Sequence, residues 1–231
     1  MKALKTRMTN RNALKIDQNA KIQSNAVFFE RVADVLDMPK GSKVLEVGCG
    51  GGELLALMSQ KGFDCYGVEP YPLYSPAFDE GRIKRSTSED LPFEADEFDL
   101  VIVKDVLEHV GNVDESISEI LRVSKKYIYL MSPNYLFPYE AHFKVPFLPM
   151  MPKFLARIYL RMLGFSRDET MFINHINYVT KISVSRIFNK FERTNMIIDL
   201  QLAKKKQYIG PLKSLIDVFC NYKFELLIIK K

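Results

Sequence analysis

The sequence is poor in cysteine and contains no long uninterrupted apolar run. The three cysteines, Cys49, Cys65 and Cys220, show neither C-x-x-C nor metal-ligand spacing, so they are expected to be reduced thiols. No apolar run approaches the roughly 20 residues of a membrane-spanning helix. The basic N-terminus, MKALKTRMTNRNALK, lacks the apolar core of a signal peptide. These absences predict a cytoplasmic protein.

What the chain does contain indicates one medium-sized folded domain. Of its 231 residues 47% are hydrophobic and 26% are charged, which is enough apolar surface for a proper core. The net charge of +5 is uneven, because both ends are basic and residues 46–119 are acidic. Basic ends could attract an anionic partner or an anionic membrane, although a solvated surface is the ordinary alternative. Aromatic and basic residues do not alternate as in a single-strand nucleic-acid platform, so no nucleic-acid partner is expected.

The hydrophobic pattern predicts strands that alternate with helices. Strands are expected at 42–47, 64–69, 81–85, 97–103, 127–131, 196–202 and in the C-terminal YKFELLIIKK. Helices are expected at 19–36, Glu53–Gln60, Val113–Val123 and 181–191. Such alternation is typical of βαβ units, so we expect a doubly wound, mostly parallel, seven-stranded α/β sheet.

Two segments depart from this alternation. Residues 1–40 are expected to form an N-terminal helical extension, with Ile22, Ala26, Phe29, Ala33 and Leu36 on one helix face. Residues 133–180 are rich in proline and aromatic residues and are expected to be an insertion after the fifth strand. The whole of 1–231 is otherwise predicted to be a single domain.

The stretch EVGCGGGE, from Glu46 to Glu53, follows the first strand. In a doubly wound sheet, ligands bind beyond the carboxyl ends of the strands, beside the first strand. Glu53 stands where a G-x-G-x-x-G fingerprint needs its third glycine, and the Lys-Ser/Thr pair of a P-loop is missing. Carboxylates at both ends of the turn would repel a pyrophosphate. They would not repel a ligand that carries sulfonium and ammonium groups.

The turn resembles the first motif, E/D-x-G-x-G-x-G, of class I S-adenosylmethionine-dependent methyltransferases. The segments SEDLPFEADEFDLVIVKDVLEHV and YIYLMSPN are similar to the group that includes the ubiquinone-biosynthesis methyltransferases, and the resemblance covers about residues 43–134. It implies a Rossmann-like methyltransferase fold with S-adenosylmethionine as cofactor. Glu69, in YGVEP, would accept hydrogen bonds from both ribose hydroxyls, as a carboxylate can.

The resemblance also supplies a set of cofactor-binding residues. Thr87 stands where many relatives have an acid that binds the adenine amino group, so adenine binding is assigned to the loop of Thr87, Ser88 and Glu89. Glu46 would bind either backbone amides or the cofactor amine. The predicted cofactor-binding residues are Glu46, Gly48, Cys49, Gly50, Gly52, Glu69, Pro70, Thr87, Ser88, Glu89, Lys104 and Asp105.

Transfer of a methyl group to oxygen or nitrogen is helped by a base that takes up the acceptor's proton. His142, in the insertion, is the preferred candidate, and Glu140 would orient its ring if the chain is extended there. His109 and Asp105 are the other catalytic candidates, with a structural role as the alternative for His109. Carboxylates and histidines do not cluster in a way that indicates a metal, so none is expected.

The insertion is expected to cover the acceptor. Its residues 153–163 predict an amphipathic helix, with Phe154, Leu155, Ile158 and Met162 on the apolar face and Lys153, Arg157 and Arg161 at four-residue spacing. Residues 145–164 would then contact a membrane surface peripherally, or the apolar face would pack on the domain as a lid, which is the favoured interpretation.

The function predicted from these features is S-adenosylmethionine-dependent O-methylation of a small or lipid-linked molecule. The alternatives are a nicotinamide-dependent oxidoreductase and a non-catalytic S-adenosylmethionine-binding protein.

Overall fold

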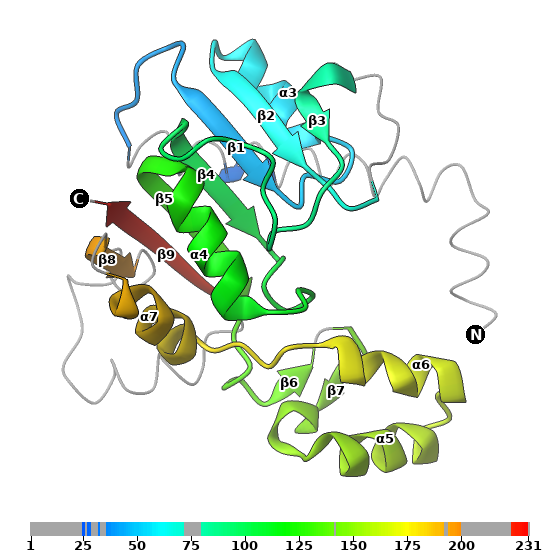
Figure 1. Ribbon diagram of the computed structural model, residues 1–231. Coiled ribbons are helices and arrows are strands. Elements are labelled where there is room, and N and C mark those ends of the chain that lie inside the picture. Colours follow the sequence, from blue (N-terminus) through cyan, green and yellow to red (C-terminus); the bar gives the residue numbers. More distant parts are fainter. Residues whose placement is uncertain are drawn as a thin grey trace.

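A computed structural model describes residues 25, 27, 28, 32, 36–71, 80–140, 142–191, 194–199 and 223–230. Within these residues a seven-stranded sheet has the order β3-β2-β1-β4-β5-β9-β8 (Figure 1). Its strands are β1 (Lys43–Val47), β2 (Asp64–Val68), β3 (Ile83–Lys84), β4 (Phe98–Lys104), β5 (Ser124–Pro133), β8 (Thr194–Asp199) and β9 (Lys223–Lys230). The strands β1 to β5 pair in parallel, whereas β9 runs antiparallel to both β5 and β8. The predicted doubly wound, mostly parallel sheet is confirmed.

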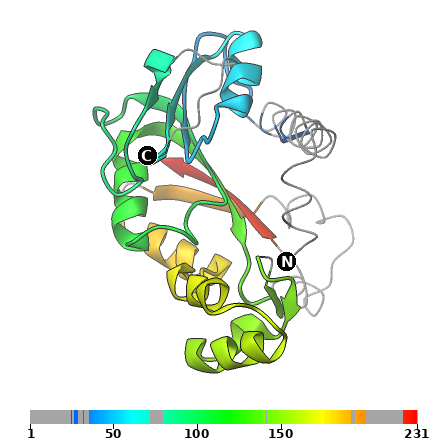
Figure 2. The same cartoon turned by 90° about the vertical axis from the view of Figure 1, so that its right-hand side faces the viewer.

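Helices cover both faces of the sheet (Figure 2). Helix α3 (Glu53–Gln60) lies on one face, and α4 (Val113–Val123) and α7 (Lys181–Lys190) lie on the other. Side chains of β4 alternate between the two layers, because successive residues of a strand point to opposite faces. Leu100 and Ile102 join the cluster around α3, whereas Val101 and Val103 join the cluster around α4. This two-sided burial explains the continuous apolar run of β4.

The helix bounds predicted for α3 and α4 agree with the structure, whereas some strand bounds differ. The third strand is only Ile83–Lys84, because a 3-10 turn, η1 (Glu80–Arg82), takes the residues before it. Strand β5 is longer than predicted and runs to Pro133, where its register with β9 ends. The antiparallel pairing with β9 therefore continues to the end of β5, where the insertion begins.

Part of the N-terminal extension is described. Asn25, Val27, Phe28 and Val32 are helical, and Asn25, Phe28, Val32 and Leu36 are buried. Of the face predicted from the sequence, Leu36 is buried, and Ile22, Ala26, Phe29 and Ala33 lie outside the described residues. Phe28 packs edge-on against Tyr129 of β5, with ring centroids 4.8 Å apart. This extension therefore contributes to the core on the α3 side.

The insertion between β5 and α7 forms a small unit beyond the carboxyl ends of the parallel strands (Figure 1). Its elements are β6 (Tyr139–Glu140), β7 (Val145–Pro146), η2 (Leu148–Met150), α5 (Lys153–Met162), α6 (Arg167–Met171) and η3 (Phe172–His175). They share an apolar cluster of Val145, Leu148, Ala156, Leu160 and Ile173. The unit thus has a small core of its own.

Helix α5 buries a different face from the one expected. Ala156 and Leu160 are its buried residues, whereas Phe154, Leu155, Ile158 and Met162 are all exposed. The favoured interpretation, a lid helix that packs its large apolar face on the domain, is wrong. Ala156 and Leu160, with the partly buried Tyr159, pack on the apolar cluster of the insertion, and the four predicted apolar side chains point outward.

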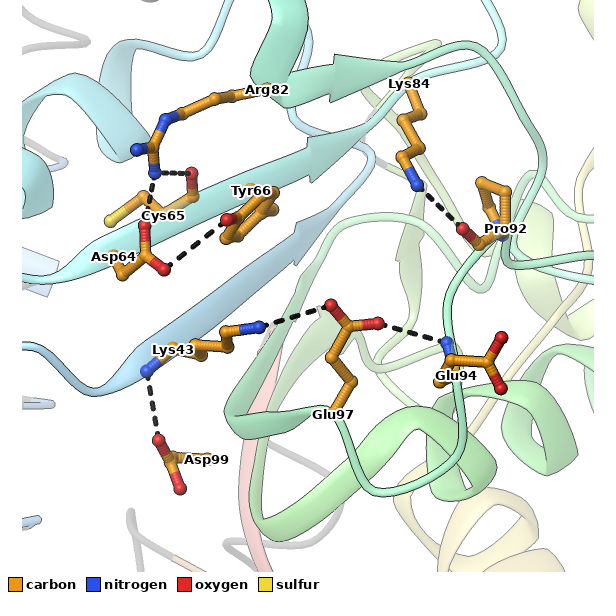
Figure 3. A network of polar contacts seen from close by, with 10 residues as sticks. All are labelled: Lys43, Asp64, Cys65, Tyr66, Arg82, Lys84, Pro92, Glu94, Glu97 and Asp99. Atoms are coloured by element: carbon orange, nitrogen blue, oxygen red, sulfur yellow. Dashed lines mark hydrogen bonds and ion pairs between the residues drawn. The ribbon is translucent and has the colours of Figure 1, made fainter.

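A polar network lies at the opposite, amino-terminal ends of the strands (Figure 3). The Lys43 amide donates to Asp99 over 3.0 Å and its ammonium donates to Glu97 over 3.4 Å, which joins β1 to β4. Arg82 pairs with Asp64 and so joins η1 to β2. The charged contacts fix this end of the sheet and leave the carboxyl ends for the ligand.

Candidate functional site

The glycine-rich turn after β1 needs glycine for two separate reasons. Gly48, Gly50 and Gly52 have φ angles of 74°, 54° and 77°, a region that side chains with a Cβ rarely adopt. A Cβ on Gly48 would also lie 2.5 Å from Val106 Cγ2, whereas one on Gly50 would meet nothing within 4 Å. Gly48 is therefore required by packing inside the protein. Gly50 faces open space from which a ligand can approach the backbone.

A cavity of about 440 Å³ lies beside this turn, within the range of small-molecule sites. It lies at the carboxyl ends of β1, β2 and β4, where the strand order changes direction. The residues that line it are Val47, Gly48, Val68, Glu69, Pro70, Tyr71, Ser86, Thr87, Ser88, Glu89, Asp105, Val106, His109, Val110 and Gly111. The cavity is therefore where the sequence predicts the cofactor.

The charges of the cavity indicate the kind of ligand that it can hold. Glu69, Glu89 and Asp105 line it, and no lysine or arginine occurs among its described lining residues. A pyrophosphate would meet three carboxylates, of which Asp105 alone has a cationic partner in the described part of the chain, and this is unfavourable at short range. A ligand with a sulfonium and an ammonium group would be attracted. The lining therefore fits S-adenosylmethionine better than a dinucleotide.

Glu69 is held against the glycine turn. Its Oε2 accepts a hydrogen bond from the Gly50 amide over 3.0 Å, and its Oε1 accepts one from the Tyr71 amide over 3.3 Å. Each carboxylate oxygen has two acceptor positions, so both oxygens can also take hydrogen bonds from a ligand. The carboxylate thus joins the end of β2 to the cofactor turn.

The loop predicted to bind adenine is fixed through Glu89. The Glu89 Oε1 accepts from the amides of Gly111 and Asn112 over 2.6 and 3.3 Å, next to the start of α4. Partial burial opposes ionisation, but these amide hydrogen bonds outweigh it and lower the pKa of Glu89. The Ser88 hydroxyl is buried and contacts Ser116 over 2.9 Å. All three predicted residues line the cavity, and Thr87 is the exposed one among them.

Five of the predicted cofactor-binding residues do not line the cavity: Glu46, Cys49, Gly50, Gly52 and Lys104. Lys104 lies on the α3 side of β4, like Ile102, and its ammonium donates to Asn25 over 3.1 Å. Cys49 is buried under the turn, and burial together with the charge of Glu46 raises the pKa of its thiol to about 12. Glu46 is buried at the end of β1. Gly50 and Gly52 form the backbone of the turn.

Asp105 has an unusual backbone and a cationic partner. Its φ angle is 55°, and its Oδ2 lies 2.5 Å from the ammonium of Lys223 at the start of β9. Its Oδ1 is buried and has no hydrogen-bond partner among the described residues. An unpaired buried carboxylate oxygen is costly, so this atom fits a donor group of a bound ligand. Lys223 has no sequence motif that could have indicated this role.

The two candidate histidines contact each other beside the cavity. His142 Nδ1 lies 2.6 Å from Oε1 of Glu140, which is fully buried and also accepts from the Phe143 amide over 2.8 Å. The predicted contact between Glu140 and His142 is therefore present. The His142 ring lies edge-on to His109, with centroids 5.1 Å apart, and His109 lines the cavity. His142 itself does not line it.

The different surroundings of the two histidines shift their pKa values in opposite directions. The Glu140 hydrogen bond raises the pKa of His142 above its ordinary value. Burial, and next the neighbouring His142, lower the pKa of His109. Two neighbouring histidines with separated pKa values can hold one proton between them in a defined place. This arrangement suits acid–base chemistry.

Glu108 is a further titratable group that the sequence did not single out. It is 1% exposed, accepts a hydrogen bond from the Ser132 hydroxyl over 3.2 Å, and burial raises its pKa to about 7. It follows Asp105 in the turn after β4, next to His109. Only its place within LEHV could have drawn attention to it.

The insertion is joined to this same turn. The Asn177 amide donates to the Glu108 carbonyl over 2.8 Å, and its side chain donates to the carbonyls of Leu107 and Val110 over 3.3 and 2.7 Å. Further along, the Tyr135 amide donates to the Val179 carbonyl over 3.2 Å. Hydrogen bonds from the insertion therefore hold the turn that carries His109.

Comparison with known proteins agrees with this geometry. Residues 19–194 match a family described as a methyltransferase domain. The chain belongs to this family. S-adenosylmethionine is the cofactor of such domains, as the lining of the cavity indicates, and the nicotinamide alternative is not favoured.

The curated relatives resemble only part of this chain. An uncharacterized protein of Mycobacterium tuberculosis is 32% identical over 128 residues, which is 49% of this chain and 43% of the relative. A ubiquinone biosynthesis O-methyltransferase of Azorhizobium caulinodans is 34% identical over 82 residues, 32% of each chain. The chain thus spans less than half the length of these relatives.

Solved structures show the same fold over most of the chain. A SAM-dependent methyltransferase from Archaeoglobus fulgidus has a TM-score of 0.53 at 18% identity and covers 90% of this chain and 94% of its own. A putative sarcosine dimethylglycine methyltransferase from Galdieria sulphuraria has a TM-score of 0.55 at 11% identity, over 92% and 86%. At these identities the likeness shows the fold and not the acceptor.

Proposed function

We propose that this protein transfers a methyl group from S-adenosylmethionine to an oxygen atom of a small or lipid-linked acceptor. The observation that carries the proposal is the His142–Glu140 pair, 2.6 Å apart and next to the cavity through His109. A hydroxyl acceptor has to lose its proton, and a histidine oriented by a buried carboxylate is suited to take it. One relative whose name specifies O-methylation supports transfer to oxygen.

The cofactor would be held by the turn and by three acidic positions. Glu69 would accept hydrogen bonds from the ribose hydroxyls, and Thr87 with the backbone of Ser88 would contact the adenine. Glu46 and the buried Oδ1 of Asp105 would face the cationic end of the ligand. When bound, S-adenosylmethionine supplies an electrophilic methyl group on a sulfonium.

The protein's own contribution to the reaction would be a proton acceptor and a dry pocket. An ionised carboxylate can only accept, so the hydrogen between His142 and Glu140 belongs to Nδ1. The lone pair of His142 is then on Nε2, which would take the proton of the acceptor hydroxyl. Glu140 stabilises the resulting imidazolium. The insertion would exclude water and align the acceptor.

The cofactor assignment can be tested by calorimetry with a matched pair of glycine variants. Gly50→Asp is expected to abolish the heat of S-adenosylmethionine binding, because it fills the approach to the turn and adds a strained side chain. Gly41→Asp is the control, since Gly41 also has a positive φ, of 84°, and open space around it, but lies at the other end of β1. Absence of heat with the unaltered protein would refute the cofactor assignment.

The base assignment needs a turnover assay. Release of S-adenosylhomocysteine would be measured with a panel of phenols, catechols and polyprenylated phenols. His142→Asn should lose about 100-fold or more in kcat while it binds S-adenosylmethionine normally, because general-base catalysis contributes that much. Unchanged turnover would remove His142 from the mechanism. Cofactor binding without turnover on any acceptor in the panel would support the non-catalytic alternative.

A further inference from the structure

The outer face of helix α5 is a continuous apolar surface. Its large apolar residues are Phe154, Leu155, Ile158 and Met162, with exposed fractions of 61%, 44%, 55% and 81%. At about 100° per residue, positions 154, 158 and 162 follow one another along a single stripe of the helix. A stripe of this kind, unlike single scattered residues, marks an interaction surface. We call it the α5 stripe.

The apolar cluster inside the insertion is formed without the α5 stripe. Ala156 and Leu160 face the opposite side of the helix and are fully buried in the apolar cluster of the insertion. The helix therefore has two apolar faces, one small and buried and one large and exposed. Burial of the outer face in water-free surroundings would add to stability at about 25 cal/mol per Å².

The apolar surface continues into the segment before the helix. Phe147 and Met150 are 56% and 64% exposed. Phe147 has a φ angle of 61°, a conformation that costs free energy for a bulky residue. Its amide donates to the Pro138 carbonyl over 2.9 Å, which helps to hold this strained turn in place. Strain of this kind at an exposed aromatic residue is typical of functional surfaces.

The charges on α5 and on the segment before it have one sign. Residues 142–167 contain no aspartate and no glutamate, and their cationic residues are Lys144, Lys153, Arg157, Arg161 and Arg167. Arg157 and Arg161 lie next to the stripe, on the side between it and the buried face. Lys153 instead donates to the carbonyls of Asn174 and Ile176 over 3.1 and 2.9 Å, which holds the start of the helix. Flanking cations with an apolar centre complement an anionic lipid surface.

We infer that the α5 stripe with Arg157 and Arg161 docks on an anionic phospholipid bilayer. The helix lies flat in the interface, with its aromatic and aliphatic side chains among the acyl chains and its guanidinium groups at the headgroups. The observed helices agree with a surface position, since none in the described part of the chain is long and apolar enough to cross a membrane. This membrane contact is independent of catalysis.

The position of the stripe also bears on how a lipid-linked acceptor would reach the site. This step rests on the proposed function. The insertion that carries α5 lies beyond the carboxyl ends of the strands, on the side of the cavity (Figure 1). His142 belongs to the same insertion. A bilayer against α5 would bring a lipid-linked hydroxyl acceptor to the side on which the proposed base is located.

Vesicle flotation tests the inference. The full chain is mixed with phosphatidylcholine vesicles or with vesicles that also contain phosphatidylglycerol, and the floated fraction is measured at low and high salt. We expect flotation with the anionic vesicles and a decrease at high salt. Ile158→Gln/Met162→Gln should reduce partitioning about tenfold or more on both kinds of vesicle. Arg157→Gln/Arg161→Gln should remove the preference for anionic lipid, again about tenfold.

Ile182→Gln is the matched control, because Ile182 is an equally exposed apolar residue, at 50%, on α7 outside the stripe. It should float like the unaltered protein, and all variants should keep the same thermal midpoint. Failure of the unaltered protein to float would overturn the inference, as would an equal loss in Ile182→Gln. A dimer in sedimentation that Ile158→Gln/Met162→Gln dissociates, without vesicle binding, would assign the stripe to a second copy instead. Calorimetry with S-adenosylmethionine tests the proposed function separately.

Discussion

The imidazole of His142 is bound through Nδ1 to the carboxylate of Glu140, which is completely excluded from solvent. The two residues are only two positions apart, and β6 ends at Glu140. The same carboxylate accepts the Phe143 amide with its other oxygen, which fixes the orientation of both partners. The ring of His142 is therefore positioned before any acceptor arrives.

This contact predicts a shift in the pH dependence of methyl transfer. His142 acts as a base only when neutral, so the rate should fall as the pH is lowered through its pKa, which Glu140 raises. In Glu140→Gln the pKa of His142 should return toward its ordinary value, and the acid limb should move to lower pH. The plateau kcat should also fall about tenfold or more, since the ring loses its orientation. The pH profile of S-adenosylhomocysteine release measures both effects.

The control for this prediction is Glu169→Gln. Glu169 is exposed and binds the Ser166 amide over 2.8 Å in the capping box of α6, in the same insertion. Its loss should leave the acid limb where it is. An acid limb unchanged in Glu140→Gln would show that a group other than His142 controls it.

The buried Glu108 predicts a pH-dependent stability. Its pKa is about 7 in the folded protein against an ordinary value of 4.5, so folding favours its protonated form. The stability that it contributes is fully present below pH 4.5 and is lost as the pH rises through about 7, by an amount on the order of 3 kcal/mol. Between pH 5 and pH 8 the free energy of unfolding of Glu108→Gln, measured by chemical denaturation, should decrease less than that of the unaltered protein. Parallel pH curves for the two proteins would contradict the prediction.

The ion pair between Lys223 and Asp105 predicts a coupling between β9 and the cofactor site. Lys223→Met should weaken S-adenosylmethionine binding several-fold and lower the free energy of unfolding by about 1 kcal/mol, because the pair is partly exposed. Lys125→Met is the control, since Lys125 lies 3.5 Å from Asp99 in a more exposed pair, away from the cavity. Equal effects of the two substitutions on cofactor affinity would exclude a positioning role for Lys223.

The sequence predicted those parts of the site in which the role of a residue follows from its immediate neighbours in the sequence. The positive φ angles of Gly48, Gly50 and Gly52 follow from alternate glycines after a strand, and Glu69 follows from the end of the next strand. Lys223 could not be predicted, because its contact with Asp105, from which it is separated by 118 positions, depends on the register of β9 with β5. Long-range pairing of this kind leaves no short-range signal.

The orientation of α5 is a second feature that the local sequence pattern did not predict. Amphipathic spacing correctly predicted the helix but assigned its larger apolar face to the interior. Which face a helix buries depends on the volume of the partner layer, and the cluster around Val145 and Leu148 buries Ala156 and Leu160 and packs against Tyr159. The hydrophobic periodicity of the sequence gives no information about that volume. Lys104 was misplaced for a similar reason, since strand alternation directs it to the Asn25 side.

Gly67 predicts that packing under the cofactor turn is tight. A Cβ at this position in β2 would lie 2.5 Å from Cys49 Sγ and 2.7 Å from Leu55 Cδ1, so Gly67→Ala must displace the turn or α3. We expect a loss of about 1–3 kcal/mol in the free energy of unfolding, as for other overpacked cores, together with weaker S-adenosylmethionine binding. Gly111→Ala is the matched control for the free energy of unfolding, because its new Cβ would meet only the flexible end of Glu89, at 3.3 Å. Urea denaturation and calorimetry on both variants measure the difference, and a Gly67→Ala protein as stable as Gly111→Ala would show that the space beneath the turn yields.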